Sequence, residues 1–170
     1  KSINRDTGEA RAEKGISVIT VPENRWDRVD IKTVGLLPNV LAREAAKRQG
    51  AQEAVFVDEA GHIKEGAATN VWIVTKDGTL VTRPAEHGIL RGVTRTTVMD
   101  LAEKLGLTVE ERSFSVEEAR FAREMFITAA TTLVMPVVAV DGQTIGNGHP
   151  GLIAPQLRNA FFEDEEKTPA

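Results

Sequence analysis

Apolar residues fall along the chain in two alternating patterns, short β-rich runs and helical spacing, from residue 16 to residue 162. Short β-prone runs between turn residues predict strands, and apolar positions three and four residues apart predict helices. The predicted strands lie at 16–21, 29–34, 53–58, near 63, and at 70–75, 79–82, 107–114, 124–128 and 134–140. The predicted helices lie at 38–49, at 92–105, from 115 onward, and at 152–162. Together they predict a mixed α/β protein.

Turn and cap residues divide these elements. Pro38 suits the first turn of a helix, and Gly50 suits the position just past its end. The Lys-Asp-Gly stretch at 76–78 lies between two strand patterns and predicts a hairpin. Ser115 and Glu118, three residues apart, form a capping-box pattern at the start of the short helix.

The two ends of the chain lack such a pattern. Residues 1–15 are polar and predict a mobile lead-in or linker remnant. Because the sequence begins without methionine, we expect it to be the remainder of a longer polypeptide. Residues 163–170 predict an acidic, solvated tail. No repeat or linker divides residues 16–162, so we expect one domain there.

The composition limits the functional class. The 170 residues are 41% hydrophobic and 27% charged, as in an ordinary globular domain. Their apolar runs are far shorter than the ~20 residues that cross a bilayer, and no signal peptide is evident. The net charge of −4 gives no electrostatic signature of nucleic-acid binding. We therefore expect a soluble, cytoplasmic protein without membrane or nucleic-acid partners.

Other site chemistries find little support. Cysteine is absent, which excludes disulfides and thiol nucleophiles, and His62, His87 and His149 lack the local pairing typical of zinc sites, so we expect no metal. The stretch at 146–151 matches the GxGxxG dinucleotide pattern. However, only 19 residues follow Gly151, too few for the second parallel strand and ribose-binding acid of that motif. An ordinary glycine-rich turn is the favoured interpretation.

Lys32 departs from the apolar pattern around it. In the predicted strand at 29–34, it could be an edge-strand charge whose stem packs on carbon while its ammonium reaches water. Alternatively, burial could disfavour its charge and leave a neutral amine able to form a Schiff base. The pattern alone favours the first interpretation.

Four segments together change this balance. They are VDIKTVGLL at 29–37, IKEGAATN at 63–70, GILRGVTR at 88–95 and FITAATT at 126–132. In this order they closely resemble the class IV aminotransferases, the pyridoxal-phosphate (PLP) enzymes of fold type IV, and within them the D-amino-acid aminotransferases. The resemblance spans residues 16–162. It implies the PLP-binding large domain, with a curved mixed sheet and flanking helices, and ping-pong transamination between an amino acid such as D-alanine and a 2-oxo acid.

The resemblance also implies roles for individual residues. Lys32 matches the lysine that forms the Schiff base with PLP and shuttles the α-proton, which requires a neutral, buried amine. Glu65 matches the carboxylate that bonds the pyridine nitrogen and keeps the ring protonated. Asn70 occupies the family's asparagine position, where we expect a structural role in a turn.

The remaining implied positions contact the ring face and the phosphate. Leu90 matches the residue that packs on one face of the ring, and Val93 and Thr94 open a helix whose N-terminus suits a phosphate. Ala130 and Thr131 match the second phosphate contact and the substrate-side loop. Since alanine offers only its backbone N–H, position 130 departs from the hydroxyl of the family.

Two departures leave alternatives open. The family's smaller N-terminal domain, which supplies a phosphate-binding arginine and part of the carboxylate trap, is missing, so we expect the chain alone to hold PLP loosely. Family members are homodimers, so a dimer is also expected.

Branched-chain aminotransferases commonly have tyrosine five residues after the lysine. This chain has Leu37 there, and it contains no tyrosine. That favours the D-amino-acid branch, whereas aminodeoxychorismate lyase, or a non-catalytic binding or dimerisation module with a structural Lys32, stays open.

Overall fold

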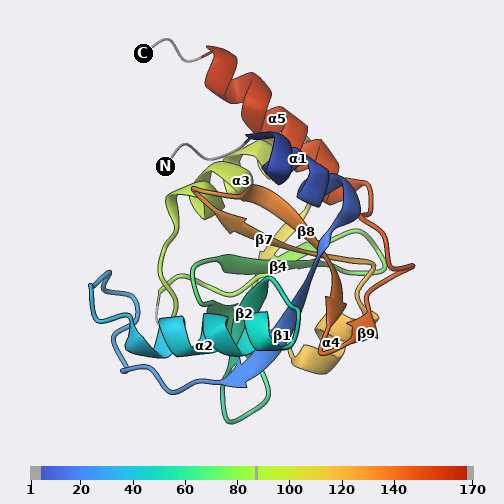
Figure 1. Cartoon of the computed structure of the whole chain (residues 1–170). Helices are drawn as coiled ribbons and strands as arrows, with labels where there is room; N and C mark the ends of the chain where they lie inside the picture. Colours follow the sequence, from blue (N-terminus) through green and yellow to red (C-terminus); the bar gives the residue numbers. More distant parts are fainter. Residues whose placement is uncertain (1–4, 87, 168–170) are drawn as a thin grey trace.

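The structure is a computed structural model that describes residues 5–86 and 88–167. In this part of the chain, nine strands form one curled sheet with helices packed against it (Figure 1). The strands are β1 Ile16–Pro22, β2 Glu53–Val57, β3 Ile63–Gly66, β4 Asn70–Val74, β5 Leu80–Thr82, β6 Val109–Glu111, β7 Glu124–Ala129, β8 Leu133–Val140 and β9 Gln143–Thr144. The helices are α1 Arg5–Lys14, α2 Leu37–Arg48, α3 Val93–Lys104, α4 Val116–Phe121 and α5 Ile153–Lys167. The predicted mixed α/β class is confirmed.

The connections of the sheet place the segment that holds Lys32. The strand order is β3-β2-β1-β8-β7-β4-β5-β6, and β9 pairs with β8. β1 runs parallel to β2 and β8, whereas β4 is antiparallel to β5 and β7. A parallel pair needs a long crossover, and residues 23–52 with α2 provide it between β1 and β2. This crossover carries Lys32 away from the end of β1.

Both faces of the central strand β4 are buried. Val71 and Ile73 enter a core that also takes side chains from β1, β2, β7 and β8. Trp72 and Val74 point to the other face, in a core covered by α3 and α5. Trp72 stacks on Phe126, with ring centroids 5.6 Å apart. A strand buried on two faces has a continuous apolar sequence, as β4 does.

Several turn and cap predictions are confirmed. Helix α2 has proline in its first turn, and Gly50 just past its end has a φ of +75°. Gly78 closes the β4–β5 hairpin with a φ of +91°. At α4, the Ser115 hydroxyl accepts a hydrogen bond from the Glu118 N–H at 3.0 Å. These elements are set by local chemistry, which explains why the sequence predicts them well.

The predicted strand at 29–34 is wrong. This segment consists of turns and irregular backbone, and no strand pairs with it among the residues that the structure describes. Val29 is buried, but Ile31 is 44% and Val34 98% exposed. The alternation that predicted a half-buried strand is therefore not matched by alternating burial. An isolated pattern cannot supply the neighbouring strand that a sheet position needs.

Both ends of the chain contain helix beyond the elements predicted from the pattern. Within residues 1–15, where a mobile lead-in or linker remnant was expected, α1 packs on β8, with Ala12 buried. The Arg158 guanidinium of α5 donates to Glu9 of α1 at 2.8 Å. One alanine and one ion pair give no periodic apolar signal, so the pattern could not predict this helix. At the other end α5 continues to residue 167 instead of ending at 162.

Two further strand predictions need adjustment. The strand expected at 107–114 is limited to β6 at the edge of the sheet. The short strand β9 was not predicted, and it pairs with β8 after a turn in which Asp141 and Gly142 both have positive φ. Within the described ranges, no helix is both long and apolar enough to span a lipid bilayer.

Candidate active site

A cavity of about 1020 Å³ opens where four separate segments meet. It is bounded by the 25–39 segment, the β3–β4 turn, the loop leading into α3 and the β7–β8 turn. The residues predicted as cofactor contacts all line it: Lys32, Glu65, Leu90, Val93, Thr94, Ala130 and Thr131. The fold therefore gathers in one cavity residues that the sequence spreads over four segments.

Lys32 lies in the irregular crossover segment and is exposed. The burial expected for it is therefore not found, because the strand that would have placed it inside a sheet does not form. Among the described residues, no acidic group forms an ion pair with its ammonium. Its side chain lines the same cavity as Glu65, which leaves the amine available to a ligand there.

Glu65, near the end of β3, is a buried carboxylate held by several donors. It is 5% exposed. Its Oε1 accepts from Arg25 Nη1 at 2.7 Å, and its Oε2 accepts from the Leu90 N–H at 2.9 Å. Burial raises the pKa of Glu65, and the charge and hydrogen bond of Arg25 oppose that rise without cancelling it. The site thus contains an oriented carboxyl group with an increased affinity for a proton.

Arg25 is the residue of this site that the sequence analysis missed. Its guanidinium lies 4.1 Å from the centroid of the Phe56 ring and is bonded on its other side to Glu23. Burial would raise the pKa of Glu23, but the hydrogen bonds and charge of Arg25 outweigh it and hold that pKa at about 2. The available signal was indirect: a carboxylate buried like Glu65 requires a cationic partner, which the pattern could not identify.

Asn70 holds the loop that precedes α3. Its Nδ2 donates to the Leu90 carbonyl at 2.9 Å, and the Leu90 N–H in turn bonds Glu65. The expected structural role of Asn70 is therefore one of linking β4 to this loop. Gly92, two residues further, faces the Asn70 amide, and a Cβ at this position would collide with Asn70 Oδ1.

We predict that Gly92→Ala destabilises the protein by about 1–3 kcal/mol, because the added methyl group forces Asn70 or the loop to move. Urea unfolding at neutral pH measures the change. Gly8→Ala in α1 is the matched control, since nothing lies within 4 Å of its Cβ and alanine favours a helix. Equal stability of the Gly92 variant and the wild type would contradict the proposed crowding.

The N-terminus of α3 is suited to an anion. Gly92 is its N-cap and provides no side-chain hydrogen bond, so first-turn N–H groups are left without a capping side chain. Thr94 is 4% exposed and lines the cavity, yet within the described part of the chain its hydroxyl has no hydrogen-bond partner. Free N–H groups, the helix dipole and a hydroxyl donor together favour a phosphate or carboxylate.

Ala130 and Thr131 form the exposed tip of the β7–β8 turn. The base of this turn is fixed, because Arg158 Nη1 donates to the carbonyls of Thr132 and Val134, both at 2.8 Å. Leu133, at the end of the turn, has a φ of +55°, which is uncommon for a residue with a side chain. The turn thus presents backbone groups and one hydroxyl at the edge of the cavity.

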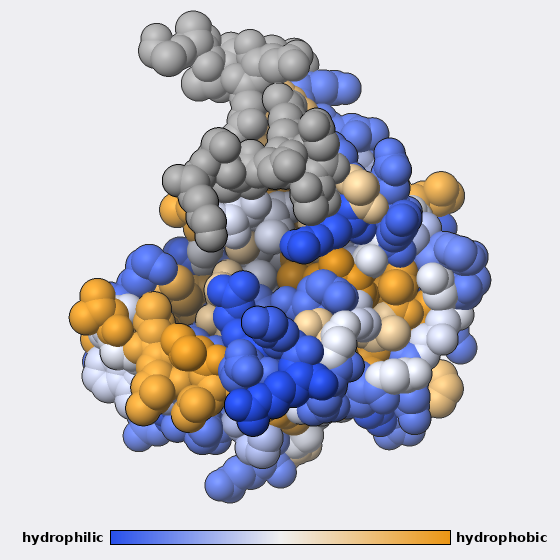
Figure 2. Space-filling view, viewed as in Figure 1, coloured by the Kyte–Doolittle hydropathy of each residue, from blue (hydrophilic) through white to orange (hydrophobic). Residues whose placement is uncertain are grey.

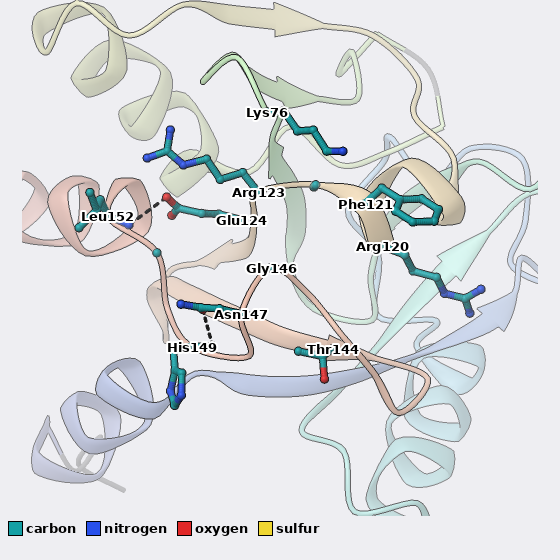
Figure 3. A pocket seen from close by; sticks show the side chains of 12 residues that line it. Lys76, Arg120, Phe121, Arg123, Glu124, Thr144, Gly146, Asn147, His149 and Leu152 are labelled. Atoms are coloured by element: carbon teal, nitrogen blue, oxygen red, sulfur yellow. Dashed lines mark hydrogen bonds between the residues drawn. The ribbon is translucent and has the colours of Figure 1, made fainter.

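A second cavity, of about 630 Å³, lies beside the N-terminus of α5 (Figure 3). The carboxylate of Glu124 accepts from the N–H groups of Leu152, Ile153 and Ala154 at 2.9–3.2 Å. A Cβ at Gly151 would collide with that carboxylate, so the glycine leaves room for the cap. Because the helix N-terminus already holds an anion, the glycine-rich stretch is an ordinary turn and not a dinucleotide site.

Comparison with known proteins gives one consistent family. A model of the amino-transferase class IV family matches residues 3–140. D-alanine aminotransferase of Bacillus licheniformis is 38% identical over 94% of this chain and 57% of its own length. That of Listeria innocua is 40% identical over 89% of this chain and 52% of its own length. The chain thus spans about half the length of these relatives.

Solved structures give the same fold. The T.th. branched-chain amino acid aminotransferase with pyridoxamine 5'-phosphate has a TM-score of 0.84 and 31% identity, over 91% of this chain and 52% of that one. The Escherichia coli branched-chain enzyme has a TM-score of 0.76 and 32% identity, over 88% of this chain and 52% of that one. The sheet and helices described above are therefore the fold of half of such a molecule.

Proposed function

We propose, because this chain belongs to the class IV aminotransferases, that it is the PLP-binding part of an enzyme that transfers the amino group of a D-amino acid to a 2-oxo acid. One observation carries the proposal. An amine at Lys32, a buried carboxyl group at Glu65 and a free hydroxyl at Thr94 line a single cavity. The amine would react with the aldehyde of PLP, the carboxyl group would bond its ring nitrogen, and the hydroxyl would bond its phosphate.

The residues of the cavity fit that cofactor. Thr94 is 4% exposed and brings a hydroxyl to the cavity lining at a helix N-terminus, which suits a phosphate. Glu65 faces the same cavity as a fixed carboxylate, which suits a protonated pyridine nitrogen. Leu90 adds an apolar residue to the same lining, for a ring face. Ala130 and Thr131 would meet the phosphate and the substrate from the β7–β8 turn.

When bound, the cofactor supplies an aldehyde that reacts with amines and a protonated ring that withdraws electrons from the substrate carbon. Lys32 is the lysine among the residues that line the cavity, so its Nζ would both bond the aldehyde carbon and carry a proton to and from a substrate carbon. Glu65 would hold the proton at the ring nitrogen, with Arg25 and the Leu90 N–H fixing its orientation.

We also propose that a second polypeptide segment completes the site. The crossover segment and α2 expose several large apolar side chains, namely Trp26, Val34, Leu37, Val40 and Leu41, which are 53–98% exposed. Figure 2 shows an apolar surface at the lower left, where Figure 1 has this region. Large apolar side chains that are exposed together favour contact with another protein surface. We propose that the family's N-terminal domain covers it, and that the complete enzyme is a cytoplasmic homodimer with residues 16–162 as its PLP domain.

The half-reaction in which an amino acid donates its amino group to the cofactor tests whether D-alanine or a branched-chain amino acid is the substrate. We expect the PLP-loaded chain to convert D-alanine to pyruvate at least about tenfold faster than it converts L-valine to its 2-oxo acid. The absorbance change from the aldehyde to the amine form of the cofactor measures both rates. The relatives named D-alanine aminotransferase and the leucine at position 37 support this order of rates.

Faster reaction with L-valine would instead support the branched-chain class that the solved structures represent, and pyruvate released from aminodeoxychorismate would support the lyase. A chain that binds no PLP and reacts with none of these substrates would support the binding or dimerisation module.

A further inference from the structure

Four charged side chains of alternating sign form a row beside the cavity. Lys64 Nζ lies 3.1 Å from Glu23 Oε2, Glu23 is bonded to Arg25, and Arg25 Nη1 lies 2.7 Å from Glu65 Oε1. All four side chains are largely buried, with exposures between 6% and 14%. Arg25 and Glu65 line the cavity, whereas Glu23 and Lys64 are not among its lining residues. The sequence pattern indicated nothing about Glu23 or Lys64.

Glu23 determines how the Arg25 guanidinium is oriented. Its Oε1 accepts from both the backbone N–H and the Nε of Arg25, at 3.0 and 2.8 Å. Its Oε2 accepts from Nη2 at 2.6 Å. This arrangement occupies one edge of the planar guanidinium and leaves Nη1 directed at Glu65. The ring of Phe56 lies under the guanidinium and limits its movement further.

We propose that Glu23 is a positioning residue which, through Arg25, sets how strongly the Glu65 carboxylate holds a proton. This inference deepens the proposed function, since Glu65 there shares its proton with the ring nitrogen of PLP. The carboxylate of Glu23 balances the cation beside Glu65, so the proton affinity of Glu65 stays high enough to keep the ring nitrogen protonated.

The directions of the individual effects agree with this role. Burial raises the pKa of Glu65, Arg25 lowers it by charge and by hydrogen bonding, and the charge of Glu23 raises it again. Other charged groups nearby are Lys64 on the same strand, Glu53 on the adjacent β2, and Lys32 and Arg91 in the cavity lining. Neutralising Glu23 also takes the partner carboxylate from Lys64. Glu53, Lys32 and Arg91 have no ion pair with Glu23 among the described residues, so a change in the proton affinity of Glu65 reports on the Lys64–Glu23–Arg25 row.

The test measures the pKa of Glu65 in the cofactor-free chain by carbon-13 NMR of its carboxyl group. Glu23→Gln keeps the length of the side chain and an oxygen acceptor for Arg25, but removes the charge. We expect the proton affinity of Glu65 to fall about tenfold, because the cation beside it is no longer balanced. Glu23→Asp keeps the charge, so in that variant Glu65 should retain most of its wild-type proton affinity. Glu118→Gln, which removes a carboxylate bonded to Arg112 elsewhere, is the control and should change nothing.

A second variant keeps the proposal testable if Glu23→Gln does not fold. Lys64→Gln removes the cation at the far end of the row, so Glu23 is less compensated and the pKa of Glu65 should rise. An unchanged or raised pKa in Glu23→Gln, or a lowered one in Lys64→Gln, overturns the proposal. Because these measurements need no PLP, they are decided separately from the proposed function, which fails if the chain binds no cofactor. With PLP bound, the pH at which the ring absorbance changes should shift down in Glu23→Gln.

Discussion

Lys32→Ala is expected to abolish covalent capture of PLP and to slow the half-reaction with D-alanine at least about a thousandfold. The reason is chemical: Lys32 is the amine that lines the cavity with Glu65 and Thr94, and alanine there can neither bond an aldehyde nor accept a proton. Borohydride treatment of the PLP-loaded wild type, followed by peptide mass spectrometry, should place the phosphopyridoxyl group on Lys32.

The control for this experiment is Lys76→Ala. Lys76 is also exposed but lines the other cavity, so its loss should leave both labelling and rate unchanged. Neither substitution should alter the free energy of unfolding appreciably, since both side chains are exposed. Labelling of the Lys32→Ala variant to the same extent as the wild type would remove the support for Lys32 as the reactive amine.

Local signals in the sequence predicted the elements that depend on local chemistry. Pro38 and Gly50 bound α2, and Ser115 caps α4, as expected. The combination of motifs also identified residues that the fold brings to one cavity, although each motif alone was weak. The segment around Lys32 shows the limit of this approach. Its period-2 alternation is genuine, but a strand needs a partner, and in the described ranges no strand pairs with the crossover between β1 and β2.

The support behind Glu65 could not be predicted for a different reason. Arg25 and Glu23 precede Lys32 in a segment without regular structure, so no period relates them to β3. The contact of Arg25 with Glu65 depends on the parallel pairing of β1 with β2 and the antiparallel pairing of β2 with β3, which bring these two residues, forty positions apart, together. Such pairings are long-range properties of the sheet, whereas a helix cap is determined by neighbouring residues.

Arg25→Gln is expected to destabilise the protein by about 3–5 kcal/mol at neutral pH. Arg25 is the shared partner of two buried carboxylates, and its removal leaves Glu65 without its cation and Glu23 with Lys64 alone. Replacing a fully paired group in this way costs more than the pair contributes, because the remaining charges are left desolvated. Arg28→Gln is the control and should have little effect, because Arg28, three residues further along the chain, is exposed and paired with Asp30.

The destabilisation by Arg25→Gln should depend on pH in a defined direction. In the wild type the pKa of Glu23 is lowered to about 2, so its pairing adds stability above the unfolded value of 4.5 and is lost as the pH falls from there toward 2. The variant lacks the pairing of Glu23 with Arg25. Burial raises the pKa of Glu65, so protonation of that carboxyl group at lower pH stabilises the folded variant. The difference between wild type and variant should therefore be largest near pH 7 and shrink between pH 4.5 and 2. Urea unfolding at several pH values measures it, and a difference that grows on acidification would show that Arg25 does not stabilise these carboxylates.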